Sequence, residues 1–255
     1  VTAVAAGSAT ITAKAGDKTA TCTVTVTTVV EKKYLPSSIS LIDTYSTDGG
    51  SYSREFTYTY NEKNQITKII SSSYNLYYTY EYDTNGNLSI QKEVSTNNGT
   101  IPTTYTYSTG QVVAKEYYNT DNPNVYDNNI YTLNNVNAAT KSSYWNTTYT
   151  YDANYNLIKV KDMVTNNTMK YNDKKGVWSS LNMPLWFQFE MPDCLWLQHS
   201  LVNSLTEFSI DDQNAIEGTF TVQNTYDVNG YPSKVEYIQN EKIAFTFNIT
   251  YVEAN

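Results

Sequence analysis

The stretch that decides the fold is Tyr80-Glu81-Tyr82-Asp83-Thr84-Asn85-Gly86-Asn87-Leu88. In an extended chain, Tyr80 and Tyr82 share one face while Glu81 points to the other. Asp83 can accept a hydrogen bond from the backbone two residues on, which starts an Asx-turn. Asn85-Gly86 then supplies residues that tolerate the positive φ of a tight hairpin loop. The stretch therefore predicts a strand, a tight turn and a return strand.

The same phrase recurs along the chain. Its other copies are residues 58–69 (YTYNEKNQITKI), 149–160 (YTYDANYNLIKV) and 225–235 (TYDVNGYPSKV), with degenerate copies at 105–110 and 131–133. Tyr, Thr and Val suit a pleated, half-buried surface. The repeats therefore predict an all-β fold, in which an array of antiparallel hairpins forms a closed or partly open barrel or a strongly curved sheet.

These copies resemble the YD repeats of Rhs-type proteins, whose pattern is close to Tyr-x-Tyr-Asp-x-x-Gly-x-Leu, although Rhs shells use many more of them. A closer resemblance is to an uncharacterised family of Bacteroidetes envelope lipoproteins with a porin-like β-barrel. Its repeats are interrupted by a segment similar to residues 173–178 (DKKGVW) followed by Asn182 and Trp186. The resemblance covers roughly residues 35–255. It implies an exported, outer-membrane-anchored lipoprotein at the cell surface or in the periplasm, and it carries no activity with it.

Residues 1–30 form a different pattern. Small alternating residues run to Ala13, turn at Ala15-Gly16-Asp17-Lys18 and return through Val26, which predicts two antiparallel strands. They resemble the C-terminal end of a bacterial group 2 Ig-like domain, whose missing strands, like a lipid anchor, are expected upstream of Val1. We therefore expect Ig-like strands at 1–30, a linker at 31–36 and a Tyr-rich barrel domain at 37–255.

Composition narrows the possible partners. The chain has 255 residues, 17 Lys+Arg against 25 Asp+Glu and a formal net charge of −8. Phosphate backbones require clustered Lys and Arg, so no nucleic-acid partner is expected. No apolar run is long enough for a membrane-spanning helix. Outer-membrane barrels carry an aliphatic lipid-facing band, whereas one face of these strands is rich in Thr, Glu, Ser and Asn, so we expect a water-soluble barrel. We also expect a monomer.

Neither cofactor nor metal is expected. Cys22 and Cys194 have no metal-ligand spacing and His199 is the single histidine, so the sequence predicts no metal site. A disulfide between the two cysteines and a pair of buried, inert thiols are both compatible with the sequence, and the thiols are the preferred interpretation.

The repeat pattern stops between residues 176 and 205, where Trp178, Trp186 and Trp196 gather with Phe, Met and Leu residues. This predicts one short helical or loop insertion near 178–205, with a helix from Pro192 to about Ser204. One interpretation is a plug that fills one end of the barrel. The other is a site for a hydrophobic or aromatic ligand.

Should a ligand site exist, we expect it against this insertion rather than on the repeats, lined by Trp178, Trp186, Phe187 and Trp196, with His199 as a polar contact. No catalytic motif is visible, and the recurring Asp residues are explained by the turns. We therefore expect a non-catalytic envelope or surface protein that binds or scaffolds another molecule, such as a glycan or another envelope protein. The alternatives are a glycan-binding module of a saccharide-uptake system and a hydrolase, which needs two facing carboxylates.

Overall fold

The computed structural model describes residues 5–27, 31–44, 50–72, 75–96, 99–118, 125–192, 197–211 and 218–255. The chain divides into two compact units, Val1–Lys33 and Tyr34–Asn255. The boundary falls inside the predicted linker, because Tyr34 to Pro36 already form the beginning of a strand of the second unit.

The first unit is an antiparallel hairpin of β1 (Gly7–Ala15) and β2 (Lys18–Val26), as predicted. Its turn contains Gly16 at a φ of +60°, a conformation that glycine adopts without steric cost. Among the described residues of this unit, no second layer covers either face, so the side chains of both strands are exposed except for the half-buried Val26. Cys22 is therefore a free and exposed thiol, and its predicted burial is wrong. Cys194 lies outside the described residues.

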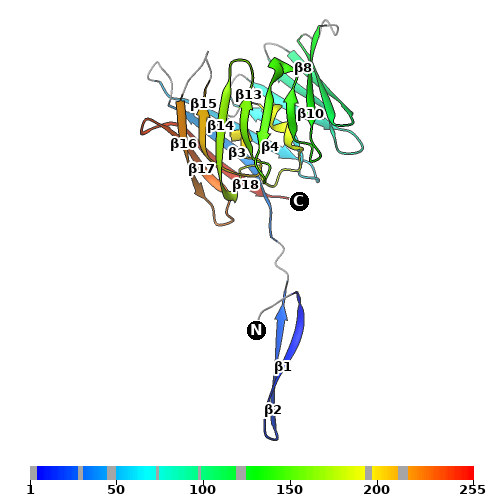
Figure 1. Ribbon diagram of the computed structural model, residues 1–255, viewed down its shortest axis with the longest axis vertical. Coiled ribbons are helices and arrows are strands. Elements are labelled where there is room, and N and C mark those ends of the chain that lie inside the picture. The colour runs from blue at the N-terminus through cyan, green and yellow to red at the C-terminus, as the bar shows by residue number, and fades with distance from the viewer. Residues whose placement is uncertain are drawn as a thin grey trace. The chain divides into compact units, whose positions relative to one another are not determined.

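The second unit is a closed barrel of 16 antiparallel strands (Figure 1). The strands are β3 (Tyr34–Asp43), β4 (Tyr52–Tyr60), β5 (Ile66–Ser71), β6 (Leu76–Tyr82), β7 (Leu88–Ser95), β8 (Gly99–Ser108), β9 (Gln111–Tyr117), β10 (Tyr126–Leu133), β11 (Ala139–Ser142), β12 (Thr148–Tyr151), β13 (Leu157–Lys161), β14 (Asn166–Lys175), β15 (Asn203–Ile210), β16 (Gly218–Tyr226), β17 (Pro232–Gln239) and β18 (Lys242–Glu253). Each strand pairs with its neighbours in sequence, and β18 pairs with β3 to close the ring. The predicted all-β hairpin array is confirmed, in its closed form.

The hairpin turns follow the chemistry of the repeat. Oδ1 of Asp83 accepts hydrogen bonds from the backbone N–H groups of Asn85 at 2.9 Å and Asn87 at 2.8 Å. The same pair of bonds is made by Asn61, Asn134, Asp152 and Asp227. Gly86 has a φ of +83°, which explains why the repeat favours Gly or Asn there. Residues 131–138 thus form a repeat whose turn begins with Asn134.

Because neighbouring strands run in opposite directions, all of these turns lie at the same end of the barrel. We call this end the repeat rim: the turns at residues 61–65, 83–87, 109–110, 134–138, 152–156 and 227–231. The opposite end, which carries the β9–β10, β11–β12 and β13–β14 connections, is the loop rim. The two ends are therefore built differently.

The second tyrosine of the repeat ties adjacent hairpins together at the repeat rim. The Tyr82 hydroxyl donates to the carbonyl oxygen of Ile66 on the neighbouring strand. Tyr107 does the same to Leu88 at 2.8 Å. Each hydroxyl satisfies a carbonyl at the start of a strand, which fixes the spacing between hairpins.

The two faces of the sheet differ in chemistry. On β17, Val235 and Tyr237 point inward and are buried, whereas Lys234 and Glu236 form a 2.7 Å ion pair on the outer face. The inward positions build one continuous core inside the barrel. The outward positions of this strand are thus mixed, with Lys234 and Glu236 followed by Ile238, which pairs with the exposed Ile243.

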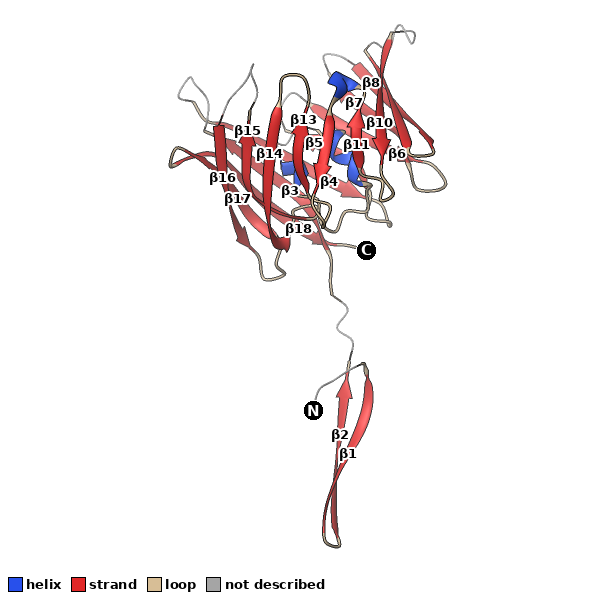
Figure 2. Ribbon diagram, in the orientation of Figure 1, coloured by secondary structure: helices blue, strands red, loops and turns tan. Residues whose placement is uncertain are grey.

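Three short 3-10 helices are described: η1 (Tyr144–Asn146), η2 (Leu185–Phe189) and η3 (Leu197–His199). Among the described residues, no helix is long and apolar enough to span a bilayer. Figure 2 shows that helical turns are a small part of the barrel unit. Of the helix predicted from Pro192 to about Ser204, residues 193–196 lie outside the described residues and Leu197–His199 form the 3-10 turn η3. Its end is wrong, because β15 begins at Asn203 and pairs with both β14 and β16.

Candidate functional site

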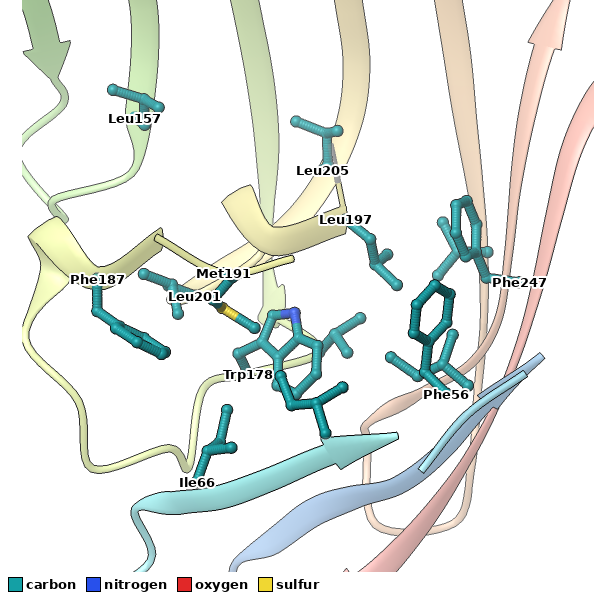
Figure 3. Close-up of a cluster of buried hydrophobic side chains, with 14 of the residues drawn as sticks. Phe56, Ile66, Leu157, Trp178, Phe187, Met191, Leu197, Leu201, Leu205 and Phe247 are labelled. Carbon is teal, nitrogen blue, oxygen red and sulfur yellow. The ribbon is translucent and has the colours of Figure 1, made fainter. Parts of the chain in front are cut away.

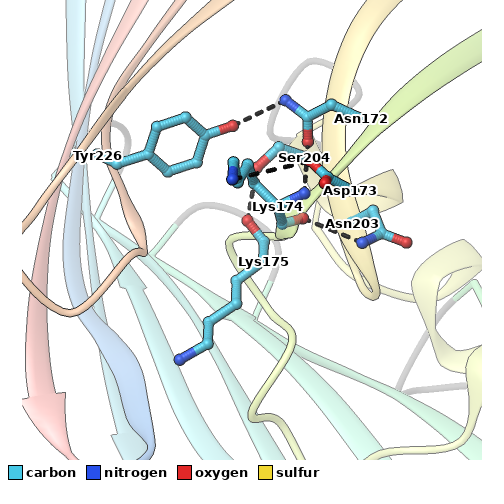
Figure 4. A network of polar contacts seen from close by, with 7 residues as sticks. All are labelled: Asn172, Asp173, Lys174, Lys175, Asn203, Ser204 and Tyr226. Carbon is cyan, nitrogen blue, oxygen red and sulfur yellow. Dashed lines mark hydrogen bonds and ion pairs between the residues drawn. The ribbon is translucent and has the colours of Figure 1, made fainter.

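The site begins with the segment between β14 and β15, residues 176–202, which we call the plug. Its chain leaves and re-enters the sheet through one narrow stem, where Gly176 N–H donates to the Val202 carbonyl at 2.9 Å. A Cβ at Gly176 would lie 2.3 Å from the Ser200 carbonyl oxygen, so only glycine fits. Just before the stem, polar contacts join β14 to β15 and β16, among them Asn203 Nδ2 to the Lys174 carbonyl at 3.1 Å and Asn172 Nδ2 to the Tyr226 hydroxyl at 2.9 Å (Figure 4).

The plug docks onto the turns of the repeat rim. Asn182 donates from its backbone to the Asn64 carbonyl at 3.1 Å and from its side chain to the Lys63 carbonyl at 2.9 Å. Trp186 N–H donates to the Asn137 carbonyl at 3.3 Å. The repeat turns therefore hold the plug as well as closing hairpins.

Inside the barrel, the first tyrosine of five repeats contacts an aromatic ring of the plug, whereas the repeat at 225–235 has Asn224 at this position. The ring-centroid distances are 5.0 Å for Tyr58–Trp178, 5.6 Å for Tyr80–Phe187, 5.5 Å for Tyr105–Trp186, 5.7 Å for Tyr131–Trp186 and 4.1 Å for Tyr149–Phe189. Figure 3 shows the plug residues Trp178, Phe187 and Leu197 beside inward-pointing strand residues such as Phe56 and Ile66. The plug and the repeats form a single core.

The predicted site residues separate into two groups. Trp178 and Trp186 are 1% exposed and Phe187 is 0% exposed, and none of the three lines a cavity identified among the described residues. Their rings fill space, as in the plug interpretation. His199 does line a cavity. Trp196 lies outside the described residues.

That cavity has a volume of about 660 Å³ and lies between the plug and the loop rim. Its wall comes from inward side chains of β9 to β15. At the loop rim it is bounded by Tyr118, Tyr144 and Asp162, and on the plug side by Gln188, Glu190 and His199. Tyr118 is 55% exposed and Tyr144 is 61% exposed, so the cavity reaches solvent at this rim. A cavity of this volume is within the range of small-molecule sites, and its wall combines aromatic side chains with many polar and charged ones.

Glu190 is the most perturbed acid of the cavity. Its Oε1 accepts a 2.6 Å hydrogen bond from the Tyr131 hydroxyl and its Oε2 a 2.8 Å bond from the Tyr105 hydroxyl. Desolvation raises the pKa of Glu190 to about 7, against the effect of the two tyrosine bonds, and Glu116 adds a small repulsion. Protein surrounds the carboxyl group closely, yet its remaining surface faces the cavity. Near neutral pH, Glu190 is therefore divided between its acid and its carboxylate forms.

Beside Glu190 lies a stack of three rings. Phe189 stacks on Tyr149 with centroids 4.1 Å apart and planes 25° apart, and on Tyr131 at 6.2 Å and 17°. All three residues line the cavity. Phe189 and Tyr149 are half-buried, so parts of their rings remain available to a ligand.

His199 lies on the plug side of the cavity, like Glu190, and is neutral. Its Nδ1 lies 3.0 Å from Gln188 Oε1, and burial lowers its pKa to about 4. At neutral pH its ring carries one proton, which the contact with the Gln188 carbonyl oxygen places on Nδ1. His199 can therefore offer Nε2 as a hydrogen-bond acceptor, in line with the polar contact that the sequence predicts.

A second aromatic pair stands at the loop rim. Tyr144 and Trp145 lie with ring centroids 6.0 Å apart, and Trp145 is 50% exposed. Trp145 and Asn146 both have positive φ values, 52° and 55°, in the left-handed region that costs a non-glycine residue energy. A large ring is thus exposed at the loop rim, next to Tyr144, which lines the cavity.

Sequence reasoning missed most of this site. Glu190 carries no signal in the sequence beyond its place in the insertion, and Tyr131 is visible only as part of a degenerate repeat. Trp145 is the one tryptophan outside the insertion, which is the signal that could have drawn attention to it. Among the described residues, no group of three or more His, Cys, Asp or Glu side chains is arranged to hold a metal ion.

No protein-family model and no curated protein sequence matches the chain. Among solved structures, the barrel is similar to a porin-like protein from Bacteroides uniformis ATCC 8492, with 15% sequence identity, a TM-score of 0.36 and coverage of 86% of this chain and 97% of that one. A porin-like protein from Bacteroides vulgatus ATCC 8482 gives 11% identity, a TM-score of 0.40 and coverage of 86% and 99%. At these values the likeness concerns the barrel alone and says nothing of a ligand.

Proposed function

We propose that the chain is a non-catalytic protein of the cell envelope or surface, whose plugged barrel binds a small molecule in the cavity above the plug. The observation that carries this is the cavity itself, about 660 Å³ in volume and walled by aromatic and polar side chains. The barrel is closed and the plug is held by backbone hydrogen bonds, so the walls are rigid and the site is preformed.

The envelope assignment rests on the likeness of the first 30 residues to Ig-like strands, on the likeness of the repeats to envelope lipoproteins and on the acidic composition. Fractionation of cells that produce the full-length protein tests it. Recovery in the membrane or periplasmic fraction is expected, and recovery in the cytoplasm would contradict it.

The binding assignment is tested with a variant that fills the cavity. Val160 on β13 lines the cavity, whereas the next residue, Lys161, points outward and is exposed. Melting temperatures of the wild type, Val160→Trp and Lys161→Trp are compared in a panel of sugars, amino acids, amines and carboxylic acids. We expect at least one class to stabilise the wild type and Lys161→Trp but not Val160→Trp. A panel without effect, or an effect that survives in Val160→Trp, would remove the proposal.

A glycan is the second candidate ligand. The stacked rings of Phe189 and Tyr149 could receive the face of a sugar, and Asn129 and Asn167 line the same cavity with side-chain amides for its hydroxyl groups. Neutral mono- and disaccharides in the same panel test this reading.

A further inference from the structure

We propose that the cavity selects a small organic cation, with an ammonium group beside Glu190 and an apolar body against Phe189 and Tyr149. This inference rests on the proposed binding function and specifies the class of ligand. Three independent features of the cavity lead to it.

The first feature is the arrangement of the rings. Tyr131, Phe189 and Tyr149 are stacked on the cavity wall. Tyr131 donates a hydrogen bond to the Glu190 carboxyl group, and Phe189 precedes Glu190 in the sequence. The faces of aromatic rings carry negative electrostatic potential, which attracts cations and receives the methyl or methylene groups around an ammonium centre. A ligand beside Glu190 therefore shares the cavity with these rings.

The second feature is the distribution of charge. The described lining contains Glu116, Asp162 and Glu190 but neither Lys nor Arg. The strands do carry lysines, but the alternation of the strand directs them outward: on β14, Met169 is buried in the core, while the neighbouring Lys170 pairs with Glu207 at 2.8 Å on the outer face. The field inside the cavity is therefore negative, which favours a cation over a neutral or anionic ligand.

The third feature is unused hydrogen-bonding capacity. Each oxygen of Glu190 accepts one tyrosine bond, which leaves lone pairs free for an N–H donor or a positive centre. Gln198 also lines the cavity, and its buried Oε1 has no hydrogen-bond partner among the described residues. Acceptors without donors at the same cavity are complementary to an ammonium group.

The experiment compares a cation with its uncharged isostere. Choline and 3,3-dimethylbutan-1-ol have the same shape and differ in the charge at the quaternary centre. Binding to the wild-type chain is measured by NMR titration at about pH 8, where Glu190 is mostly ionised because its pKa is about 7. We expect choline to bind at least about tenfold more tightly than the alcohol.

The variant Glu190→Gln keeps the shape of the side chain and an acceptor for the tyrosines but removes the charge. We expect it to lose at least about tenfold in choline affinity while its affinity for the alcohol stays the same. Glu236→Gln, on the outer face, is the matched control and should behave as the wild type. Circular dichroism and melting curves test whether each variant is folded. If Glu190→Gln does not fold, the comparison of choline with the alcohol on the wild-type chain still tests the inference.

The outcomes separate this inference from the function on which it rests. Equal affinity for choline and the alcohol, or a saccharide such as cellobiose binding while choline does not, would overturn the cation inference and leave a ligand-binding barrel. A chain that binds neither these probes nor any compound of the wider panel would overturn both.

Discussion

The hydroxyl of Tyr131 donates a 2.6 Å hydrogen bond to Oε1 of Glu190, and so joins a repeat strand of the barrel wall to the plug. Tyr105 makes the equivalent bond to Oε2 at 2.8 Å. Two strands of the wall thus meet on one carboxyl group whose pKa is raised to about 7. The protonation of Glu190 is coupled to the packing of the plug, and this makes stability depend on pH.

The first prediction concerns Glu190. Its pKa in the folded chain is about 7 against an ordinary value of 4.5, so the folded state holds a proton that the unfolded state has lost between these pH values. Stability should fall as pH rises from about 4.5 to 7, by about 2–3 kcal/mol, since one pKa unit corresponds to about 1.4 kcal/mol. Urea unfolding across this range measures it, and Glu190→Gln should remove this contribution.

His199 produces the opposite dependence. Its pKa falls from 6.5 to about 4 on folding, so stability should be lost as pH decreases from 6.5 to 4. In the wild type the two effects oppose each other between about 4.5 and 6.5. Glu190→Gln should therefore unmask a loss of stability in acid, and His199→Gln should steepen the loss toward neutral pH. A Glu190→Gln profile identical to that of the wild type would contradict the Glu190 assignment, and a His199→Gln profile identical to that of the wild type would contradict the His199 assignment.

The second prediction concerns the plug core. Trp186 is 1% exposed and contacts the rings of Tyr105, Tyr131 and Phe187. Trp186→Ala should lower the free energy of unfolding by about 3–5 kcal/mol, because a large cavity is left in the core. The half-exposed Trp145 is the control, and Trp145→Ala should change stability by less than about 1 kcal/mol. Comparable losses in the two variants would argue against an internal plug.

The third prediction concerns the stem of the plug. Gly176→Ala places a Cβ 2.3 Å from the Ser200 carbonyl oxygen and 2.8 Å from that of Asn203, so the backbone must shift. We expect a loss of more than about 2 kcal/mol, in the range of overpacked cores. Gly50→Ala has nothing within 4 Å of its new Cβ and should be nearly neutral. Melting curves of the two variants are sufficient, and equal melting temperatures would show that the stem is not tight.

The fourth prediction concerns the turn position of the repeats that has a positive φ. Tyr155 has a φ of +65° at the turn position that Gly86 and Gly230 occupy at +83° and +80°. It is 40% exposed, so its ring contributes little packing. Tyr155→Gly should therefore raise stability by about 1 kcal/mol, the cost of a left-handed non-glycine residue. Gly86→Tyr, the reciprocal change, should lower stability by a similar amount, and a stabilising effect there would refute the argument.

The hairpins could be predicted from the sequence because their determinants are local. Asp83 and Gly86 act within one turn, and the alternation of Tyr80 and Tyr82 is visible in any short window. The cavity could not be predicted in this way. Glu190 meets Tyr105 and Tyr131 only because the plug folds back into the barrel, and nothing in the residues around Glu190 specifies that return.

The burial of the aromatic residues of the insertion also could not be predicted from the local sequence. Trp178, Trp186 and Phe187 were the most conspicuous candidates for a ligand site, since they interrupt a Tyr-rich pattern. An apolar composition fits both a buried plug and a binding surface, so it does not distinguish between them. Their burial follows from the tyrosines that face them, which come from strands between residues 58 and 131 of the chain.

The pairing of repeat tyrosines with plug aromatics also constrains the number of hairpins that can surround the plug. A closed ring can in principle grow or shrink by whole hairpins, because each hairpin brings its own turn and its own neighbour contacts. Here a duplicated hairpin between Tyr80 and Tyr105 would present a tyrosine for which the plug has no ring, and a deleted one would leave Phe187 or Trp186 facing a gap. The plug therefore constrains how many hairpins fit between β4 and β12.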